Sequence, residues 1–285
     1  MLRIALQSKG RLYEESAALL GSIGINIDDP KRKFLSKASN FPLEVLYLRD
    51  DDIPQVVSSG TASLGIVGLN EVREKGCDVR VVAPLGFGGC RLSVAIPKDK
   101  AASYEGPQSL QGLRIATSYP NILNGFLKEN GVSASVEVIC GSVEIAPAAG
   151  IADAIFDIVS SGGTLVSNSL VEVQKVFRSE AVLIANNDLS QEDSALLDEI
   201  LFRIEADKDS KGKKYLLMNI PTASLDEAIK ILPAMRSPTV MPLASEGWCS
   251  LHSVVNAEDL WVKVRQLKAI GAEGILVIDL DKIIL

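Results

Sequence analysis

The stretch DAIFDIVSSGGTLVSN (residues 153–168) decides the fold and suggests the chemistry. An apolar run with two aspartates leads directly into Ser-Ser-Gly-Gly-Thr, and a second apolar pattern follows. This order predicts a buried strand, a turn of small residues and the start of a helix. Backbone N–H groups at such a turn can bind an anion, and the helix dipole favours negative charge there.

We call residues 160–164 the serine–glycine loop and expect it to hold a monophosphate. Its members are Ser160, Ser161, Gly162, Gly163 and Thr164. The glycines permit positive φ and let a ligand approach the backbone closely. No lysine follows them and their spacing is not G-x-G-x-x-G, which disfavours a triphosphate loop or a dinucleotide site.

The aspartates of this stretch favour a phosphorylated sugar as the ligand. Asp153 and Asp157 are four residues apart, so on a strand they share one face. A carboxylate near a phosphate site is useful when it accepts hydrogen bonds from sugar hydroxyls or faces a metal ion. The alternative is a plain β-turn with Asp153 at the start of a strand.

Composition limits the classes of protein. The chain has 285 residues, of which 47% are hydrophobic and 23% charged, as in ordinary globular proteins of two to three domains. A net charge of −7 disfavours a general nucleic-acid or membrane-surface binder. The four cysteines form no C-x-x-C pair, which predicts free thiols, and the N-terminus lacks a signal-peptide pattern. We therefore expect a cytoplasmic protein with no nucleic-acid or membrane partner.

Strands alternate with helices along most of the chain, which is typical of parallel α/β sheets. A weak echo between residues 58–68 and 148–162 suggests two similar lobes with strand ends facing a shared cleft. We expect lobe I in residues 1–95, with a return segment in 181–206, and lobe II in 96–180. Within lobe II, a helix is expected at residues 142–150 (SVEIAPAAG).

The last part of the chain has a separate pattern. The charged segment DKDSKGKK (residues 207–214) has no apolar anchor and is predicted to be a linker. Beyond it, residues 212–285 follow a βαββαβ order, which is ferredoxin-like. The expected fold is α/β, with a two-lobed periplasmic-binding-protein-like core and a C-terminal ferredoxin-like domain.

A family resemblance becomes specific in the opening stretch. The chain fits the pattern E-x5-G-x-A-x2-I-x-D-I-x2-S-G-x-T-L from Glu144 to Leu165. This resembles the signature of the ATP phosphoribosyltransferase family, the first enzymes of histidine biosynthesis. The segments IALQSKGRL, LGFGGCRLSVAIP, RSEAVLIA and MRSPTVMPLASEGW also resemble family segments. The C-terminal domain resembles that of the long form, which carries its own regulatory domain.

The resemblance implies a displacement reaction. Adenine N1 of ATP attacks C1′ of phosphoribosyl pyrophosphate, giving N1-(5-phosphoribosyl)-ATP and pyrophosphate, with Mg²⁺ neutralising the leaving group. N1 of neutral adenine already has a lone pair, so the reaction depends on alignment and charge stabilisation rather than on a strong base. This agrees with a chain whose single histidine, His252, we interpret as structural.

The resemblance also implies roles for individual residues. The serine–glycine loop would hold the ribose 5′-phosphate, with Asp157 and Asp153 facing the ribose. Lys9, Arg11 and Arg49 would meet the phosphates of ATP or pyrophosphate, the alternative being ordinary solvated surface charges, and Asn70 and Tyr119 would lie near the ribose or base of ATP. Some family members have an aspartate where this chain has Asn70, whose amide can hydrogen-bond a ribose or adenine but carries no charge.

L-Histidine is the feedback inhibitor that the resemblance implies. We expect it in the C-terminal domain, at an interface between subunits of a homo-oligomer (dimer and hexamer). The candidate segment is RSPTV (residues 236–240), and the candidate contacts are Asn219, Ser237 and Thr239. An ordinary strand-edge turn shaped by Pro238 is the alternative.

Two other functions fit parts of the sequence. A periplasmic solute-binding protein would share the two lobes, but the lack of a signal peptide and the added βαββαβ domain disfavour it. A transcriptional regulator with an effector-binding core is disfavoured by the acidic charge and by the lack of a helix-turn-helix pattern.

Overall fold

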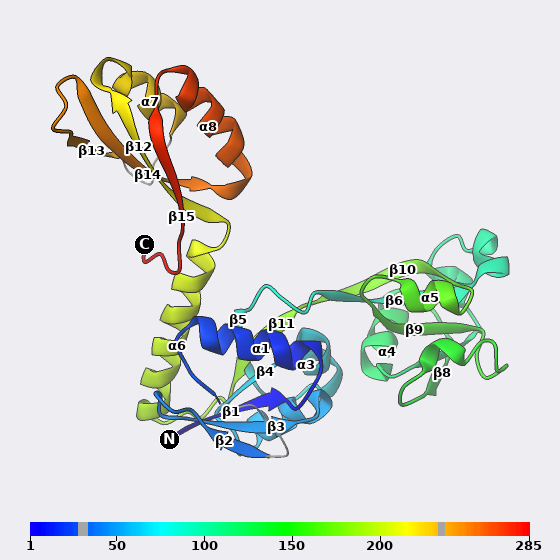
Figure 1. Ribbon diagram of the computed structural model, residues 1–285. Coiled ribbons are helices and arrows are strands. Elements are labelled where there is room, and N and C mark those ends of the chain that lie inside the picture. The colour runs from blue at the N-terminus through cyan, green and yellow to red at the C-terminus, as the bar shows by residue number, and fades with distance from the viewer. Residues whose placement is uncertain (28–33, 233–236) are drawn as a thin grey trace. The chain divides into compact units, whose positions relative to one another are not determined.

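The computed structural model describes residues 1–27, 34–232 and 237–285, and it divides into two compact units. The first unit is Met1–Leu197 and the second is Asp198–Leu285. Each is an α/β structure built on its own sheets, as Figure 1 shows. Among the described residues, no helix is both long and apolar enough to cross a membrane.

The first sheet of the first unit has six strands in the order β2-β3-β1-β4-β11-β5. Their bounds are β1 Leu2–Gln7, β2 Leu35–Lys37, β3 Leu43–Leu48, β4 Leu64–Gly68, β5 Arg80–Pro84 and β11 Ala181–Ala185. Strand β1 is parallel to β3 and β4, whereas β11 runs antiparallel to both of its neighbours. Helices α1 (Arg11–Ser22), α2 (Ile53–Ser58) and α3 (Leu69–Lys75) connect these strands, with a 3-10 turn η1 at Asp50–Asp52.

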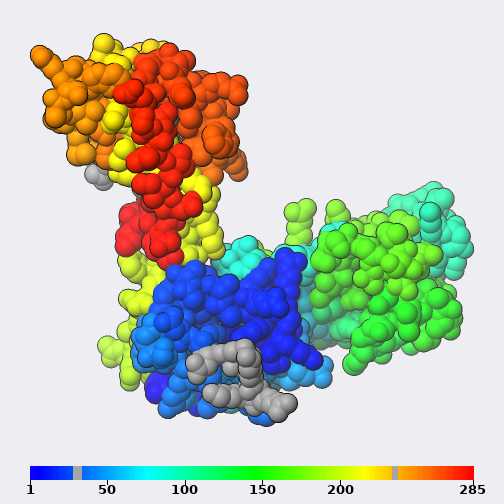
Figure 2. All heavy atoms as spheres, in the orientation of Figure 1, coloured from blue at the N-terminus to red at the C-terminus, as the bar shows by residue number. Residues whose placement is uncertain are grey.

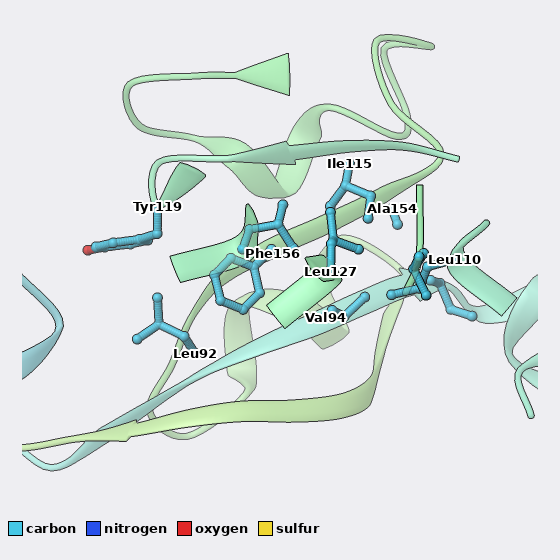
Figure 3. Close-up of a cluster of buried hydrophobic side chains, with 11 residues drawn as sticks. Leu92, Val94, Leu110, Ile115, Tyr119, Leu127, Ala154 and Phe156 are labelled. Carbon is cyan, nitrogen blue, oxygen red and sulfur yellow. The ribbon is translucent and has the colours of Figure 1, made fainter. Parts of the chain in front are cut away.

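The second sheet has five strands in the order β10-β6-β9-β7-β8. Their bounds are β6 Cys90–Pro97, β7 Arg114–Thr117, β8 Ser135–Val138, β9 Ala154–Val159 and β10 Leu170–Ser179. The helices of this lobe are α4 (Pro120–Glu129) and α5 (Gly163–Ser167), with 3-10 turns η2 (Lys98–Ser103), η3 (Pro107–Leu110) and η4 (Val143–Ile145). Phe156, fully buried, lies in the apolar cluster between this sheet and α4. Figure 3 shows the cluster, with the Tyr119 hydroxyl directed away from it.

The chain passes between the two sheets twice, and the two crossing segments pair with each other. Leu85 N–H donates to the Ala181 carbonyl, and Ala181 N–H donates to the Phe87 carbonyl, both at 2.9 Å. Gly86 N–H also donates to the Glu180 carboxylate at 3.0 Å. Gly86 has a φ of +75°, a conformation that favours glycine, so this tight pairing depends on it.

The second unit has the expected βαββαβ order. It consists of β12 (Lys213–Pro221), α7 (Leu225–Ile231), β13 (Thr239–Pro242), β14 (Trp248–Asn256), α8 (Leu260–Ala269) and β15 (Glu273–Asp279), with 3-10 turns η5 (Thr222–Ser224) and η6 (Ala257–Asp259). The strand order β13-β14-β12-β15 is antiparallel and ferredoxin-like. Residues of α7 and α8 share one apolar cluster with alternate residues of β12 and β14, so the helices cover one face of the sheet.

Two local predictions were wrong. The segment 142–150 forms only the turn η4 and not a helix, because Pro147 has no N–H to donate. The expected linker 207–214 is instead the last turn of α6 (Gln191–Ser210) and the start of β12. Its charges are anchored, since buried Asp207 accepts Lys282 Nζ at 2.8 Å and Lys211 Nζ lies 3.0 Å from the same carboxylate.

Candidate functional site

A pocket of about 350 Å³ is lined by residues from both lobes of the first unit. The first lobe contributes polar residues to its wall and the second contributes the end of β9 and the first residue of the serine–glycine loop. Its lining includes Arg11, Asp50, Asn70 and Glu71 from the first lobe, Gly88, Gly89 and Cys90 from a crossing segment, and Ile158 and Ser160 from the second lobe. This is the cleft at strand ends that the alternating pattern predicts.

The serine–glycine loop follows the carboxyl end of β9 and is open to solvent. Ser160, Ser161, Gly163 and Thr164 are exposed. Gly162 has a φ of +84°, so its left-handed conformation is the one that glycine adopts without strain. Helix α5 has only five residues, so its dipole is small and the loop's amides and hydroxyls are the main anion donors.

Asp157 lies on β9 beside this loop and has a raised pKa. Burial of the carboxyl raises the pKa to about 6, the Ile158 N–H bond lowers it, and nearby Glu144 raises it. The Ile158 N–H donates to Asp157 Oδ1 at 2.8 Å. The carboxylate therefore retains acceptor capacity for ligand hydroxyls above about pH 6.

Asp153 is not brought to the loop. It precedes β9, whereas the loop follows it, so about seven residues of extended chain, roughly 20 Å, separate the two. Arg114 Nη2 lies 3.1 Å from Asp153 Oδ1, and Arg114 N–H donates to Oδ2 at 3.0 Å. Hydrogen bonds from Arg114 hold the pKa of Asp153 below its ordinary value. Its contacts are those of a structural ion pair.

The three basic residues follow two neighbouring strands. Lys9 and Arg11 come after β1 and Arg49 after β3, and these parallel strands are in register to Gln7 and Leu48. Arg11 lines the pocket and also donates to Glu15 at 3.1 Å. The Arg49 side chain is 80% exposed, with Nε 3.2 Å from Asp51, and it is not among the lining residues of the pocket.

Two of the expected ATP contacts meet in a buried network between the lobes. The Tyr119 hydroxyl donates to Glu71 Oε1 at 3.0 Å, and Asn70 Nδ2 donates to the same oxygen at 2.9 Å. The Ser179 hydroxyl donates to Asn70 Oδ1 at 2.8 Å, and Asn70 N–H donates to Ser179 Oγ at 3.0 Å. Asn70 is 5% exposed and Tyr119 9%, so both hold the lobes together in this structure.

Glu71, which the sequence analysis missed, is the charged centre of this network. Burial raises the pKa of its carboxyl to about 7, and the Tyr119 hydrogen bond opposes that shift. The same burial, together with the Glu71 charge, raises the pKa of Tyr119. No spacing in VGLNEV indicates that this glutamate meets a tyrosine almost fifty residues later.

A second glutamate of α3 makes a different contact across the lobes. The Glu74 carboxylate accepts the N–H groups of Asn121 and Ile122 at 2.9 and 3.0 Å, in the first turn of α4. Asn121 Nδ2 in turn donates to the Glu74 carbonyl at 2.8 Å. Because the first N–H groups of a helix have no partner within it, a carboxylate there is stabilising.

The second unit carries the residues expected for histidine. Asn219 is half-buried on β12, Ser237 is exposed before β13, and Thr239 is exposed at the start of β13. Arg236, part of the same expectation, lies outside the described residues. His252 is held by two hydroxyls, with Tyr215 at 2.9 Å from Nδ1 and Ser250 at 3.0 Å from Nε2, which fits a structural role.

Comparisons with known proteins give the family. The family model for ATP phosphoribosyltransferase matches residues 49–206, and the model for the HisG C-terminal domain matches residues 210–282. The chain belongs to the ATP phosphoribosyltransferase family. The resemblance stated from the sequence is thereby confirmed, including the long form with its C-terminal domain.

Full-length relatives agree. The chain is 58% identical over 285 residues to the ATP phosphoribosyltransferase of Phocaeicola vulgatus and 56% identical over 284 residues to that of Bacteroides thetaiotaomicron, with 100% of each chain covered. The Cytophaga hutchinsonii enzyme is 52% identical over 100% of this chain and 99% of its own. The chain is therefore an enzyme that transfers the phosphoribosyl group of phosphoribosyl pyrophosphate to ATP, the first step of histidine biosynthesis.

Solved structures support the two-lobed fold. A chain of the ATP phosphoribosyl transferase (HisG:HisZ) complex from Thermotoga maritima matches with a TM-score of 0.60 and 26% identity, covering 72% of this chain and 99% of that one. More than a quarter of the present chain has no counterpart there. The substrate-binding protein of an amino acid ABC transporter matches with a TM-score of 0.50 at 12% identity, covering 73% and 93%. That likeness shows the fold alone and confirms its periplasmic-binding-protein-like form.

Replacing Glu71 by glutamine tests the burial of its charge in the ATP phosphoribosyltransferase cleft. A carboxyl whose pKa is raised by folding binds its proton more tightly in the native state, so stability falls as pH rises from about 4.5 to about 7. Glu71→Gln should therefore raise the free energy of unfolding by roughly 1–3 kcal/mol near pH 8, with little effect near pH 4.5. Urea unfolding followed by circular dichroism at both pH values measures this.

Glu74→Gln is the matched comparison, because it makes the same substitution one turn further along α3. Loss of the negative charge at the α4 N-terminus should lower the free energy of unfolding by roughly 1 kcal/mol near pH 8. If the free energy of unfolding near pH 8 rises in both variants or falls in both, the buried charge of Glu71 is not destabilising while that of Glu74 is stabilising, and the prediction is wrong.

Proposed function

We propose that phosphoribosyl transfer takes place in the cleft of the first unit, between the serine–glycine loop and the basic strand ends. The observation that carries the proposal is the exposed loop at the end of β9, whose first residue lines one pocket with Arg11 and Asn70. The ribose 5′-phosphate would bind the amides and hydroxyls of Ser160, Ser161, Gly162, Gly163 and Thr164. The ribose would lie against Asp157.

ATP would occupy the first-lobe side of the same cleft. Lys9 and Arg11 after β1, and Arg49 after the neighbouring β3, supply positive charge for the phosphates of ATP or the departing pyrophosphate. Asn70 offers an amide to ribose or adenine, although Ser179 and Glu71 already occupy part of its hydrogen-bonding capacity. A contact with Tyr119 requires the hydroxyl bond to Glu71 to rearrange, because the ring is almost fully buried.

The reaction requires the enzyme to align two substrates and to stabilise the charge that develops between them. The lone pair of adenine N1 forms the new bond to C1′ while the C1′–oxygen bond to pyrophosphate breaks, and no proton has to be removed before the attack. The ionised Asp157 would stabilise the ribose hydroxyls, and its negative charge is favourable beside the positive charge that develops on the sugar ring. Alignment of the two substrates in one cleft supplies the rest of the rate acceleration.

The reaction is consistent with a divalent metal, and we propose Mg²⁺. In the described part of the chain, no three His, Cys, Asp or Glu side chains group as a metal site. That suits an ion carried by the pyrophosphate of the substrate, since Mg²⁺ keeps several waters and takes few protein ligands. Asp157, beside the loop, would be one carboxylate near the ion, and the ion would neutralise charge on the leaving pyrophosphate.

Gly162→Ala tests the assignment of the loop. The φ of +84° is strained for alanine, so the loop amides would lose their arrangement and kcat/KM for phosphoribosyl pyrophosphate should fall at least tenfold. Pyrophosphate release with ATP, phosphoribosyl pyrophosphate and Mg²⁺ measures this. Gly131→Ala is the control, because Gly131 has a φ of +65° in the same lobe with open space around it. Equal kinetics in both variants would refute the assignment.

Asp157 predicts a specific pH dependence. A carboxylate with a pKa of about 6 is progressively protonated as pH falls below that value, and it then loses acceptor strength for the ribose. The substrate's own phosphate titrates near the same pH. Asp157→Asn should therefore lower kcat/KM for phosphoribosyl pyrophosphate roughly ten- to a hundredfold near pH 8 and reduce the slope of the acid limb by one proton. An unchanged slope would contradict the role given to Asp157.

We also propose that L-histidine inhibits the enzyme through the second unit and that this unit joins copies of the chain. Among the described residues of this unit, neither α7 nor α8 covers the opposite face of the sheet. Register places Thr239, His252, Leu217 and Leu276 side by side on that face. Leu276, Ile278 and Met241 are about half exposed. Figure 2 shows β15, in red, at the surface of this unit. Such an apolar face supports association between copies of the chain, which we propose as a dimer and a hexamer. We also propose that the enzyme is cytoplasmic.

Asn219→Ala tests the histidine site. Asn219 shares this face with Thr239, so losing its amide should raise the histidine concentration for half inhibition at least tenfold. The ratio of inhibited to uninhibited pyrophosphate release measures the effect, with Asn256→Ala at the exposed end of β14 as control. Equal sensitivity in the two variants would count against this site.

A further inference from the structure

The first residue of the serine–glycine loop is held by a side chain from the neighbouring strand. Arg91 Nη1 donates to the carbonyl oxygen of Ser160 at 3.0 Å. Arg91 lies on β6 opposite Val159, the last residue of β9, so the contact is made where the strand becomes the loop. In the described part of the chain, the other side-chain hydrogen bonds to the loop come from Ser161 in the loop, Ser167 in α5 and Asn168 at the end of α5.

Arg91 is itself held by a carboxylate on β10, the other neighbour of β6 in the sheet. Glu172 of β10 accepts Arg91 Nε at Oε1 and Nη2 at Oε2, each at 2.6 Å. The Ser93 hydroxyl donates to Glu172 Oε1 at 2.8 Å. Hydrogen bonds from Arg91 hold the pKa of Glu172 below its ordinary value. This two-pronged pairing sets the plane of the guanidinium as well as its position.

A fixed carbonyl sets the direction of the next amide. The peptide bond is planar and trans, so the Ser161 N–H points away from the oxygen that Arg91 holds. The exposed loop needs that constraint, because Gly162 and Gly163 let its backbone adopt many conformations. The charge of Arg91 is largely compensated by Glu172, which makes it a poor direct partner for a phosphate.

We propose that Arg91, held by Glu172, is a positioning residue that orients the loop amides for the 5′-phosphate of phosphoribosyl pyrophosphate. This rests on the proposed function of the loop. A positioning role for Arg91 predicts a different result from direct binding of the phosphate by Arg91. If Arg91 bound the phosphate itself, releasing it from Glu172 would leave affinity unchanged or improve it. In the role proposed, the same release disorders the loop and weakens affinity.

Glu172→Gln is the test, because it keeps the size of the side chain and removes the ionic contact. The KM for phosphoribosyl pyrophosphate should rise roughly five- to tenfold while the KM for ATP changes less than about twofold. Glu44→Gln is the matched control. Arg3 pairs with Glu44 at 3.0 Å in the other sheet, and hydrogen bonding to Arg3 likewise lowers the pKa of Glu44. Melting temperatures should fall by similar amounts in both variants.

An unchanged or lower KM for phosphoribosyl pyrophosphate in Glu172→Gln, or an equal rise in Glu44→Gln, would overturn the inference. If Glu172→Gln does not fold, Ser93→Ala removes one support of the carboxylate and should raise the same KM about two- to threefold; no rise there would be equally decisive. The two variants distinguish the role of Arg91 from phosphate binding by the serine–glycine loop. A defect in Gly162→Ala without one in Glu172→Gln removes only the role of Arg91, whereas no defect in either removes both proposals.

Discussion

The pairing of the two crossing segments is the constraint on which the first unit depends. Leu85 and Phe87 bond to Ala181, so the two passages of the chain between the sheets are tied at one point. That tie places the end of β9 opposite the polar ends of β1 and β4 and creates one pocket from two sheets. The contacts of Glu71 and Glu74 also connect α3 to the second lobe.

Burial, rather than a catalytic acid–base pair, sets the electrostatics of this cleft. Asp157 and Glu71 both have raised pKa values because each carboxyl has lost water, and neither has an arginine or lysine as its main partner. Asp153 and Glu172 show the opposite shift because arginines hold them. Carboxylates of the second kind maintain the structure, whereas those of the first kind are costly to bury and remain available to ligands or to protonation.

Sequence reasoning succeeded where a pattern is local. The strand β9, the exposed loop after it and the βαββαβ order each follow from period and turn residues. It failed where sequence distance hides contact. The pairing of Arg91 with Glu172 depends on the order β10-β6-β9, which no local pattern contains. A shared face for Asp153 and Asp157 did not bring both to the loop, because four residues of strand span roughly 13 Å. At residues 142–150 the helical spacing was overridden by Pro147.

The strand order of the first sheet also bears on how the protein is made. Among the described strands of that sheet, β5 has β11 as its single neighbour, and β11 lies beyond the whole second lobe in sequence. A chain emerging from the ribosome therefore has no place for β5 until residues 181–185 have been added. The second lobe, contiguous from β6 to β10, can complete its sheet first. The apolar residues of β4, buried between β1 and β11 in the finished protein, stay uncovered on one edge until then, and a pause in synthesis before β11 would expose them to aggregation.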